Sequence, residues 1–215
     1  MDTKQEVFEH FEVPDPIRIK KAHNLITQHY KDLQGLNLLE CGVAKGGLAD
    51  TLKDKGVKCF GVDVNPREIR GIKIIQSDLN KGIPDFGLKF DIIFAGEVME
   101  HLFDDAAFLN HCREALGPNG TLIITVPNLV FGPNRFLMLF GQMPKYFAYA
   151  PYHYHIYNKK TLGHLFKEAG LEVLKFTSTH LLFSTRRNKF GRIFEILGDI
   201  FPSLGAHLIV FAQKL

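Results

Sequence analysis

The chain has 215 residues, of which 46% are hydrophobic and 23% are charged. These are the proportions of an ordinary folded protein, so they exclude a disordered, collagenous or coiled-coil chain. A chain of this length predicts one large domain whose core needs no disulfide or metal to be stable. The formal net charge of +3 is mild and gives no indication of a nucleic-acid partner.

The three cysteines, Cys41, Cys59 and Cys112, are an odd number and form no CxxC pair. Neither a disulfide framework nor a thiolate zinc site is expected, and a reducing, cytoplasmic location fits best. The first residues show no basic segment followed by an apolar one, so we expect no signal peptide. No run of 18 apolar residues occurs, so we also expect no transmembrane helix.

The chain begins with a polar, helix-like stretch, residues 1–34, which Pro14 and Pro16 divide. Its second part predicts a helical cap with one face made of Ile19, His23, Ile26 and Tyr30. Residues 35–128 then alternate short apolar runs with polar helical stretches. Strands are predicted at 36–41, 58–64, 72–76, 90–95 and 121–126, and helices at 48–55 and 105–116. This alternation is typical of βαβ units and a parallel sheet.

The pattern changes at residues 129–157, which contain five of the six tyrosines and four phenylalanines. Prolines and glycines interrupt this segment, so we expect an irregular aromatic insertion. The remainder, 158–215, predicts a helix at 158–169, a sixth strand at 171–176 and a last strand at 207–213. A second insertion, 178–205, carries a basic cluster of Arg186, Arg187, Lys189 and Arg192. We interpret this cluster as a solvated face, with an anionic substrate or a membrane surface as the alternative.

The segment LLECGVAKGG, residues 38–47, predicts a strand that ends in an acid and a glycine turn that opens a helix. Gly42 permits the sharp turn, and Gly46 or Gly47 lets a ligand approach the backbone. A pyrophosphate could bind at the helix N-terminus, but the string is a poor dinucleotide fingerprint, and Glu40 would lie close to phosphates. A carboxylate there suits S-adenosylmethionine, which has an ammonium, a sulfonium and no phosphate.

Acids also follow the next two predicted strands. Asp63 ends the second strand, where a carboxylate can accept hydrogen bonds from ribose hydroxyls of either an NAD or an adenosylmethionine cofactor. Asp78 follows the third strand and can accept from an adenine amino group. Because ligands bind at the carboxyl edge of open α/β sheets, these acids indicate one shared site.

Five motifs in this order resemble the class I S-adenosylmethionine-dependent methyltransferases, particularly the small-molecule subgroup of ubiquinone-biosynthesis-type and methionine-biosynthesis-associated enzymes. They are LLECGVAKGG, GVDVNP, QSDLNKGIP, FDIIFAGEVMEHLFD and LGPNGTLIITVPN, and the resemblance spans residues 36–127. It implies a Rossmann-like, seven-stranded, mostly parallel sheet with helices on both faces. The last strand would lie antiparallel between the fifth and sixth.

The resemblance also implies cofactor contacts. The methionine end would lie against Glu40, Gly42, Val43, Ala44 and Gly46, the ribose against Asp63, and the adenine against Val64, Ser77, Asp78 and Leu79. Glu97, Val98 and His101 would lie at the end of the fourth strand, beside the reactive methyl group. Glu97 would contact the cofactor or its water rather than move a proton. Ala44 stands where the family often has a glycine, so it brings a methyl group near the cofactor.

Two histidines are candidate catalytic residues. His101 could be a general base, a positioning residue or a partly buried histidine at a helix start. His153 and His155 would face the same way on an extended strand, so His153 could line a substrate pocket or bond within a folded flap. No third ligand is placed near this pair, so no metal is expected.

These observations predict methyl transfer from S-adenosylmethionine to a small-molecule acceptor, with S-adenosylhomocysteine as product. The favoured acceptor is a hydroxyl group on an aromatic, quinone-like or sugar compound, because the first insertion is aromatic and because the resemblance to the small-molecule subgroup implies it. Both insertions would form a lid over that acceptor, and the protein would be a monomer or homodimer. A non-catalytic adenosylmethionine-binding protein and an NAD(P)-dependent oxidoreductase are the alternatives.

Overall fold

The computed structural model of the chain describes residues 16–44, 46–144, 147, 152–181 and 189–215. In these residues a seven-stranded sheet has the order β3-β2-β1-β4-β5-β7-β6. The strands are β1 (Asn37–Cys41), β2 (Lys58–Asp63), β3 (Ile72–Gln76), β4 (Phe90–Gly96), β5 (Leu116–Pro127), β6 (Leu171–Ser178) and β7 (His207–Lys214). β1 to β5 pair in parallel, whereas β7 is antiparallel to both β5 and β6. The predicted sheet, including the antiparallel last strand, is therefore confirmed.

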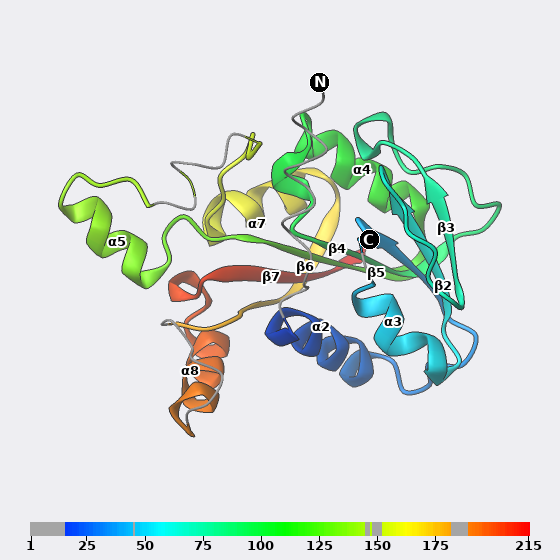
Figure 1. The fold of residues 1–215 in the computed structure, drawn as a ribbon, viewed down its shortest axis with the longest axis horizontal. Coiled ribbons are helices and arrows are strands. Elements are labelled where there is room, and N and C mark those ends of the chain that lie inside the picture. The colour runs from blue at the N-terminus through cyan, green and yellow to red at the C-terminus, as the bar shows by residue number, and fades with distance from the viewer. Residues whose placement is uncertain (1–15, 45, 145–146, 148–151, 182–188) are drawn as a thin grey trace.

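Helices cover both faces of the sheet, as Figure 1 shows. One face carries α2 (Pro16–His29) and α3 (Leu48–Leu52), and the other carries α4 (Asp105–Ala115) and α7 (Lys159–Glu168). Neighbouring strand residues point to opposite faces. Leu38 accordingly packs in the cluster that includes the α2 and α3 side chains, and Leu39 packs in the cluster that includes those of α4 and α7. Both layers are needed because the central strands are apolar on both sides.

Short turns of 3-10 helix lie between these elements along the chain. They are η1 (Lys53–Lys55), η2 (Leu79–Lys81), η3 (Met99–His101) and η4 (Pro202–Leu204). No helix in the described residues is long and apolar enough to cross a membrane.

The cap helix α2 is confirmed, although its buried side differs in part from the predicted face. Ala22, Leu25 and Ile26 are buried, whereas Ile19 and Tyr30 are only half-buried against the same core. The buried side is therefore rotated slightly from the predicted one. Residues 1–15 of the predicted cap lie outside the described residues.

Each insertion contains a helix. The irregular structure expected for residues 129–157 is wrong for α5 (Gly132–Leu139), and α8 (Lys189–Ile200) in the second insertion was not predicted. Pro133 lies in the first turn of α5, where its missing N–H is not needed. Gly141, with a φ of +70°, follows the end of that helix. The residues that suggested irregularity therefore mark the boundaries of a helix. Arg186 and Arg187 of the basic cluster lie outside the described residues.

Candidate functional site

The loop after β1 packs directly against the end of β4. Gly42 has a φ of +74°, and a Cβ atom there would lie 2.5 Å from Cγ2 of Val98. The Gly42 amide donates a hydrogen bond to the Val62 carbonyl over 2.8 Å, which ties the loop to β2 as well. Only glycine meets both requirements, so the carboxyl ends of β1, β2 and β4 come together around this residue.

Glu40 fixes the glycine loop to the start of α3. Its carboxylate accepts hydrogen bonds from the amides of Leu48 at 3.0 Å and Ala49 at 2.8 Å. A Cβ atom at Gly47 would lie 2.1 Å from Glu40 Oε1, so this side chain fills the turn. Burial raises the pKa of Glu40 to about 7, against the lowering effect of the two amides. The contact predicted between Glu40 and the methionine end of a cofactor stays a prediction.

Asp63 joins the loop after β2 to the glycine loop. Its Oδ2 accepts from the Ala44 amide and its Oδ1 from the Asn65 amide, each at 2.9 Å. Ala44 has a φ of +49°, a left-handed conformation that glycine adopts more readily. Val64, the next residue after Asp63, is 50% exposed, so an apolar surface lies beside the carboxylate.

Residues 77–79 follow β3 and are predicted to contact the adenine. They lie next to Asp63. The Ser77 amide donates to the Asp63 carbonyl over 3.0 Å. Asp78 precedes η2 and accepts from the Asn80 amide at 2.9 Å. Leu79 is buried in the core at 6% exposure, so its side chain packs inward. Any contact of Leu79 with a cofactor would therefore come from its backbone.

Glu97, at the end of β4, joins three elements. Its carboxylate pairs with Arg18 of α2 at 3.1 Å and accepts from the Thr125 hydroxyl at 3.1 Å. Nε2 of His207, at the start of β7, lies 3.4 Å from Oε2. Sequence reasoning missed Arg18 and His207, because each is far from Glu97 along the chain and lies in no local motif.

Glu100 and His101 lie in η3, just after β4, and His153 packs beside them. His101 Nδ1 lies 3.0 Å from the Tyr152 carbonyl oxygen, and its ring centroid is 4.7 Å from that of His153. Burial lowers the pKa of His101. Burial, with a contribution from His101, lowers the pKa of His153 to about 4. Burial, and then the nearby Glu97, raise the pKa of Glu100 well above its usual range.

His153 and His155 do not face the same way. His155 Nδ1 lies 3.5 Å from Asp105 Oδ2. His153 instead lies with Glu100 and His101, so that one ligand atom from each of the three is within 4.8 Å of the others. The sequence indicates no third ligand near the His153–His155 pair, whereas the structure places Glu100 and His101 beside His153.

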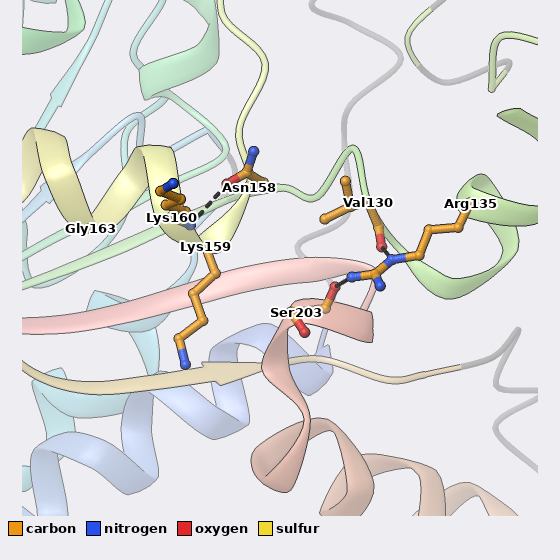
Figure 2. Close-up of a pocket in the computed structure, with 7 residues that line it drawn as sticks. All are labelled: Val130, Arg135, Asn158, Lys159, Lys160, Gly163 and Ser203. Carbon is orange, nitrogen blue, oxygen red and sulfur yellow. Dashed lines mark hydrogen bonds between the residues drawn. The ribbon is translucent and has the colours of Figure 1, made fainter.

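A cavity of about 490 Å³ lies apart from these residues. It is lined by Val130, Arg135, Asn158, Lys159, Lys160, Gly163 and Ser203, and none of the predicted cofactor residues contributes to it. Figure 2 shows the Arg135 guanidinium directed at two backbone carbonyls, those of Val130 at 2.6 Å and Ser203 at 3.0 Å. Arg135 therefore connects α5 to η4, and the cavity is not the predicted cofactor site.

Comparisons with known proteins point to one enzyme family. A family model described as a methyltransferase domain matches residues 6–175. The ubiquinone biosynthesis O-methyltransferase of Azorhizobium caulinodans is 28% identical over 131 residues, which are 53% of this chain and 52% of that protein. Its counterpart from Cereibacter sphaeroides is 30% identical over 153 residues, 65% of this chain and 61% of that protein. The chain thus spans about half to three fifths of the length of these relatives.

A solved structure with a similar fold is the 1,6-didemethyltoxoflavin-N1-methyltransferase of Burkholderia thailandensis, with bound 1,6-didemethyltoxoflavin and S-adenosylhomocysteine. Its TM-score is 0.64 at 14% identity, covering 93% of this chain and 79% of that chain. At this identity the likeness concerns the fold alone.

Proposed function

Because the chain belongs to the methyltransferase-domain family, within the class I S-adenosylmethionine-dependent methyltransferases, we propose that it transfers the methyl group of S-adenosylmethionine to a hydroxyl oxygen of a small-molecule acceptor. The observation that carries the proposal is the position of Asp63. Its carboxylate is held at the end of β2 by the Ala44 amide, beside the exposed Val64. A ribose diol on the carboxylate and an adenine ring on the valine would use both features.

In this reaction the hydroxyl oxygen attacks the methyl carbon in line with the sulfur. The new carbon–oxygen bond forms as the carbon–sulfur bond breaks, the electron pair returns to sulfur, and the hydroxyl proton passes to a base. The sulfonium already activates the methyl group, so the protein contributes mainly by positioning the reactants and excluding water. We assign the positioning of the cofactor to the glycine loop around Gly42 and to Glu97 and Val98.

His101 is a better candidate base than His153. A carbonyl oxygen only accepts hydrogen bonds, so the contact with the Tyr152 carbonyl places the proton of a neutral His101 on Nδ1. Nε2 then carries the lone pair that can accept a proton. His153, with a pKa lowered to about 4, is a weak base at neutral pH.

We propose that residues 129–157 and 178–205 cover the acceptor, and that the aromatic residues of the first insertion contact it. The relatives named O-methyltransferases support a hydroxyl acceptor, because that name states that the methyl group is transferred to an oxygen atom. A pure binding protein would retain the cofactor site without turnover. An NAD(P)-dependent oxidoreductase is disfavoured because Glu40 lies in the turn that would hold phosphates.

Calorimetric titration of the purified protein with S-adenosylhomocysteine, NAD and NADP tests the cofactor. We expect micromolar binding of S-adenosylhomocysteine only, weakened at least tenfold by Asp63→Asn, which removes a charge-assisted hydrogen-bond acceptor. Asp85→Asn is the matched control, because Asp85 is exposed and accepts from the Gly87 amide. A folded protein that does not bind S-adenosylhomocysteine would contradict the proposal.

The reaction itself requires an acceptor screen. The protein is incubated with S-adenosylmethionine and panels of phenols, catechols and sugars, with matched amines for comparison, and S-adenosylhomocysteine is quantified. Turnover with hydroxyl acceptors supports the proposal. Turnover confined to amines contradicts O-methylation, and cofactor binding without turnover across the panels supports the pure binding protein.

A further inference from the structure

Three cationic side chains line the cavity of about 490 Å³ that lies apart from the predicted cofactor residues. They are Arg135 of α5 and Lys159 and Lys160 at the start of α7, and no acid is among the lining residues. Figure 2 shows the Arg135 guanidinium on one side of the cavity and the two lysines on the other. The cavity volume is within the range of small-molecule sites, about 300 to 1,000 Å³.

None of these three cations is paired with a carboxylate in the part of the chain that the structure describes. Lys159 Nζ lies 5.3 Å from the centroid of the Phe176 ring. Arg135 donates to two backbone carbonyls, and the Lys160 ammonium has no hydrogen-bond partner among the described residues. Cations that are not neutralised by the protein give a cavity a positive potential, which attracts anions. The cavity is therefore suited to an anionic ligand.

The dipole of α7 makes the position of the two lysines more unfavourable. Lys159 and Lys160 begin the helix, and its first turn has no acidic residue. Positive charge at a helix N-terminus opposes the dipole. The Lys160 and Thr161 amides already donate to Asn158 Oδ1, at 2.9 Å and 3.0 Å, so a ligand would be bound by side chains and not by these amides. A charge cluster that opposes local stability is expected where it has a function.

Arg135 is held in place for such a ligand. Its Nε donates to the Val130 carbonyl at 2.6 Å, and its Nη2 donates to the Ser203 carbonyl at 3.0 Å. These two bonds fix the plane of the guanidinium, and its other N–H groups have no partner among the described residues. A fixed guanidinium binds phosphate or carboxylate oxygens at a low cost in side-chain entropy.

We propose that this cavity binds the phosphate group of an organic phosphate, with Arg135, Lys159 and Lys160 as its cationic contacts. A phosphate group carries a charge of about −1.5 to −2 and three acceptor oxygens. It therefore suits three cations better than a carboxylate, which carries a single negative charge. Val130 and Gly163 provide an uncharged wall for the organic part of the ligand.

The cavity lies at the same edge of the sheet as Glu97. Val130 follows the end of β5, and Ser203 precedes β7. Pro127 at the end of β5 pairs with His207, whose Nε2 lies 3.4 Å from Glu97 Oε2. An acceptor whose hydroxyl lies beside Glu97 would extend along this edge and place its phosphate in the cavity. This role rests on the proposed function, whereas phosphate binding by the cavity does not.

Calorimetric titration of the full chain with inorganic pyrophosphate, at low ionic strength, tests the site. We expect one pyrophosphate per chain, bound more weakly as NaCl is added, because salt screens the attraction. Lys159→Gln/Lys160→Gln should weaken binding at least tenfold, since it removes two charge-assisted contacts. The matched control, Lys58→Gln/Lys167→Gln, removes two exposed ammonium groups outside the cavity and should bind like the parent.

Two results would overturn the proposal. The first is a parent protein that binds pyrophosphate no more tightly than Lys159→Gln/Lys160→Gln, since the anion would then be held elsewhere or not at all. The second is an equal loss of binding in the control, which would show attraction by overall charge alone. Circular dichroism verifies folding. If the double variant does not fold, Lys160→Gln carries the test, because its ammonium has no hydrogen-bond partner among the described residues.

Two further probes distinguish a soluble phosphate from a lipid headgroup. Glucose 6-phosphate represents the soluble source, and vesicles of phosphatidylglycerol, compared with vesicles of phosphatidylcholine, represent the lipid source. Binding of the sugar phosphate that is lost in Lys159→Gln/Lys160→Gln supports a soluble ligand. Binding of phosphatidylglycerol vesicles alone, lost in the same variant, supports a lipid phosphate. Binding of neither probe would contradict the assignment to an organic phosphate.

Titration of the same variants with S-adenosylhomocysteine separates this proposal from the proposed function. A protein that binds pyrophosphate but not S-adenosylhomocysteine contradicts the cofactor assignment and leaves the phosphate site standing. The opposite result contradicts the phosphate site alone.

Discussion

Replacement of Glu40 by glutamine should change how the stability of the protein depends on pH. Glu40 is 3% exposed and accepts hydrogen bonds from the Leu48 and Ala49 amides. Burial outweighs these bonds and raises its pKa from 4.5 to about 7. The folded state therefore favours the protonated carboxyl. Glutamine has the same shape and no charge, so Glu40→Gln does not titrate, but its side-chain nitrogen cannot accept from one of the two backbone amides, and that hydrogen bond is lost at every pH.

The size of the effect follows from this shift. A folded-state pKa above the unfolded value means that the stability contribution is complete below about pH 4.5 and is lost as the pH rises through about 7. A change of one pKa unit corresponds to about 1.4 kcal/mol, so the parent should lose roughly 3 kcal/mol relative to Glu40→Gln between pH 4.5 and pH 8. At pH 4.5 the variant should be less stable than the parent by about 1 kcal/mol or more, because of the lost hydrogen bond.

Urea unfolding followed by circular dichroism at pH 4.5 and pH 8 measures this difference. Other titrating groups, including Glu100, are common to both proteins and cancel in the comparison. Glu172→Gln, at an exposed position on β6, is the control and should follow the parent at both pH values. If the parent and Glu40→Gln lose stability in parallel, Glu40 is ionised in the folded protein, and the two helix amides outweigh its burial.

Three further substitutions test the geometry of the same edge. Ala44→Gly should raise the thermal midpoint by about 1 to 2 °C, because relief of the left-handed φ of +49° slightly exceeds the entropy that glycine adds to the unfolded chain; a lower midpoint would mean that Ala44 is not strained. Gly42→Ala should lower the free energy of unfolding by about 2 kcal/mol or more, since its new Cβ would meet Val98 Cγ2 at 2.5 Å; an unchanged urea midpoint would show that the loop shifts freely. Arg18→Met should cost about 3 kcal/mol by leaving the Glu97 carboxylate without its guanidinium partner, and Glu97→Gln in the same chain should recover most of it. Failure of the double variant to recover would contradict the pairing.

The strands could be predicted from the sequence because their signals are local. In β1 and β4, pairs of neighbouring apolar residues such as Leu38–Leu39 face opposite layers, which produces the continuous apolar runs of a buried parallel sheet. The helices α5 and α8 were not predicted, and α5 was missed because glycine and proline were interpreted as interruptions. The effect of proline on a helix depends on its position. Pro133 lies in the first turn of α5, where proline is favourable, whereas a proline in the helix interior would break the helix.

The parts of the site that depend on local signals could be predicted, and the parts that depend on contacts between distant segments could not. Glu40, Asp63 and Asp78 each lie at or just after a strand end, so parallel strands alone bring them to one edge. The approach of His153 to Glu100 depends on the Tyr154 amide bonding to the Glu100 carbonyl, a contact between segments more than fifty residues apart. On a regular extended strand, His153 and His155 would lie on the same side. Here the backbone is instead bonded to η3, because the Tyr154 and His155 amides donate to the Glu100 carbonyl. One imidazole reaches His101 and the other reaches Asp105. A side-chain cluster assembled by such a contact has no spacing signature in the sequence, so it is found only in the folded structure.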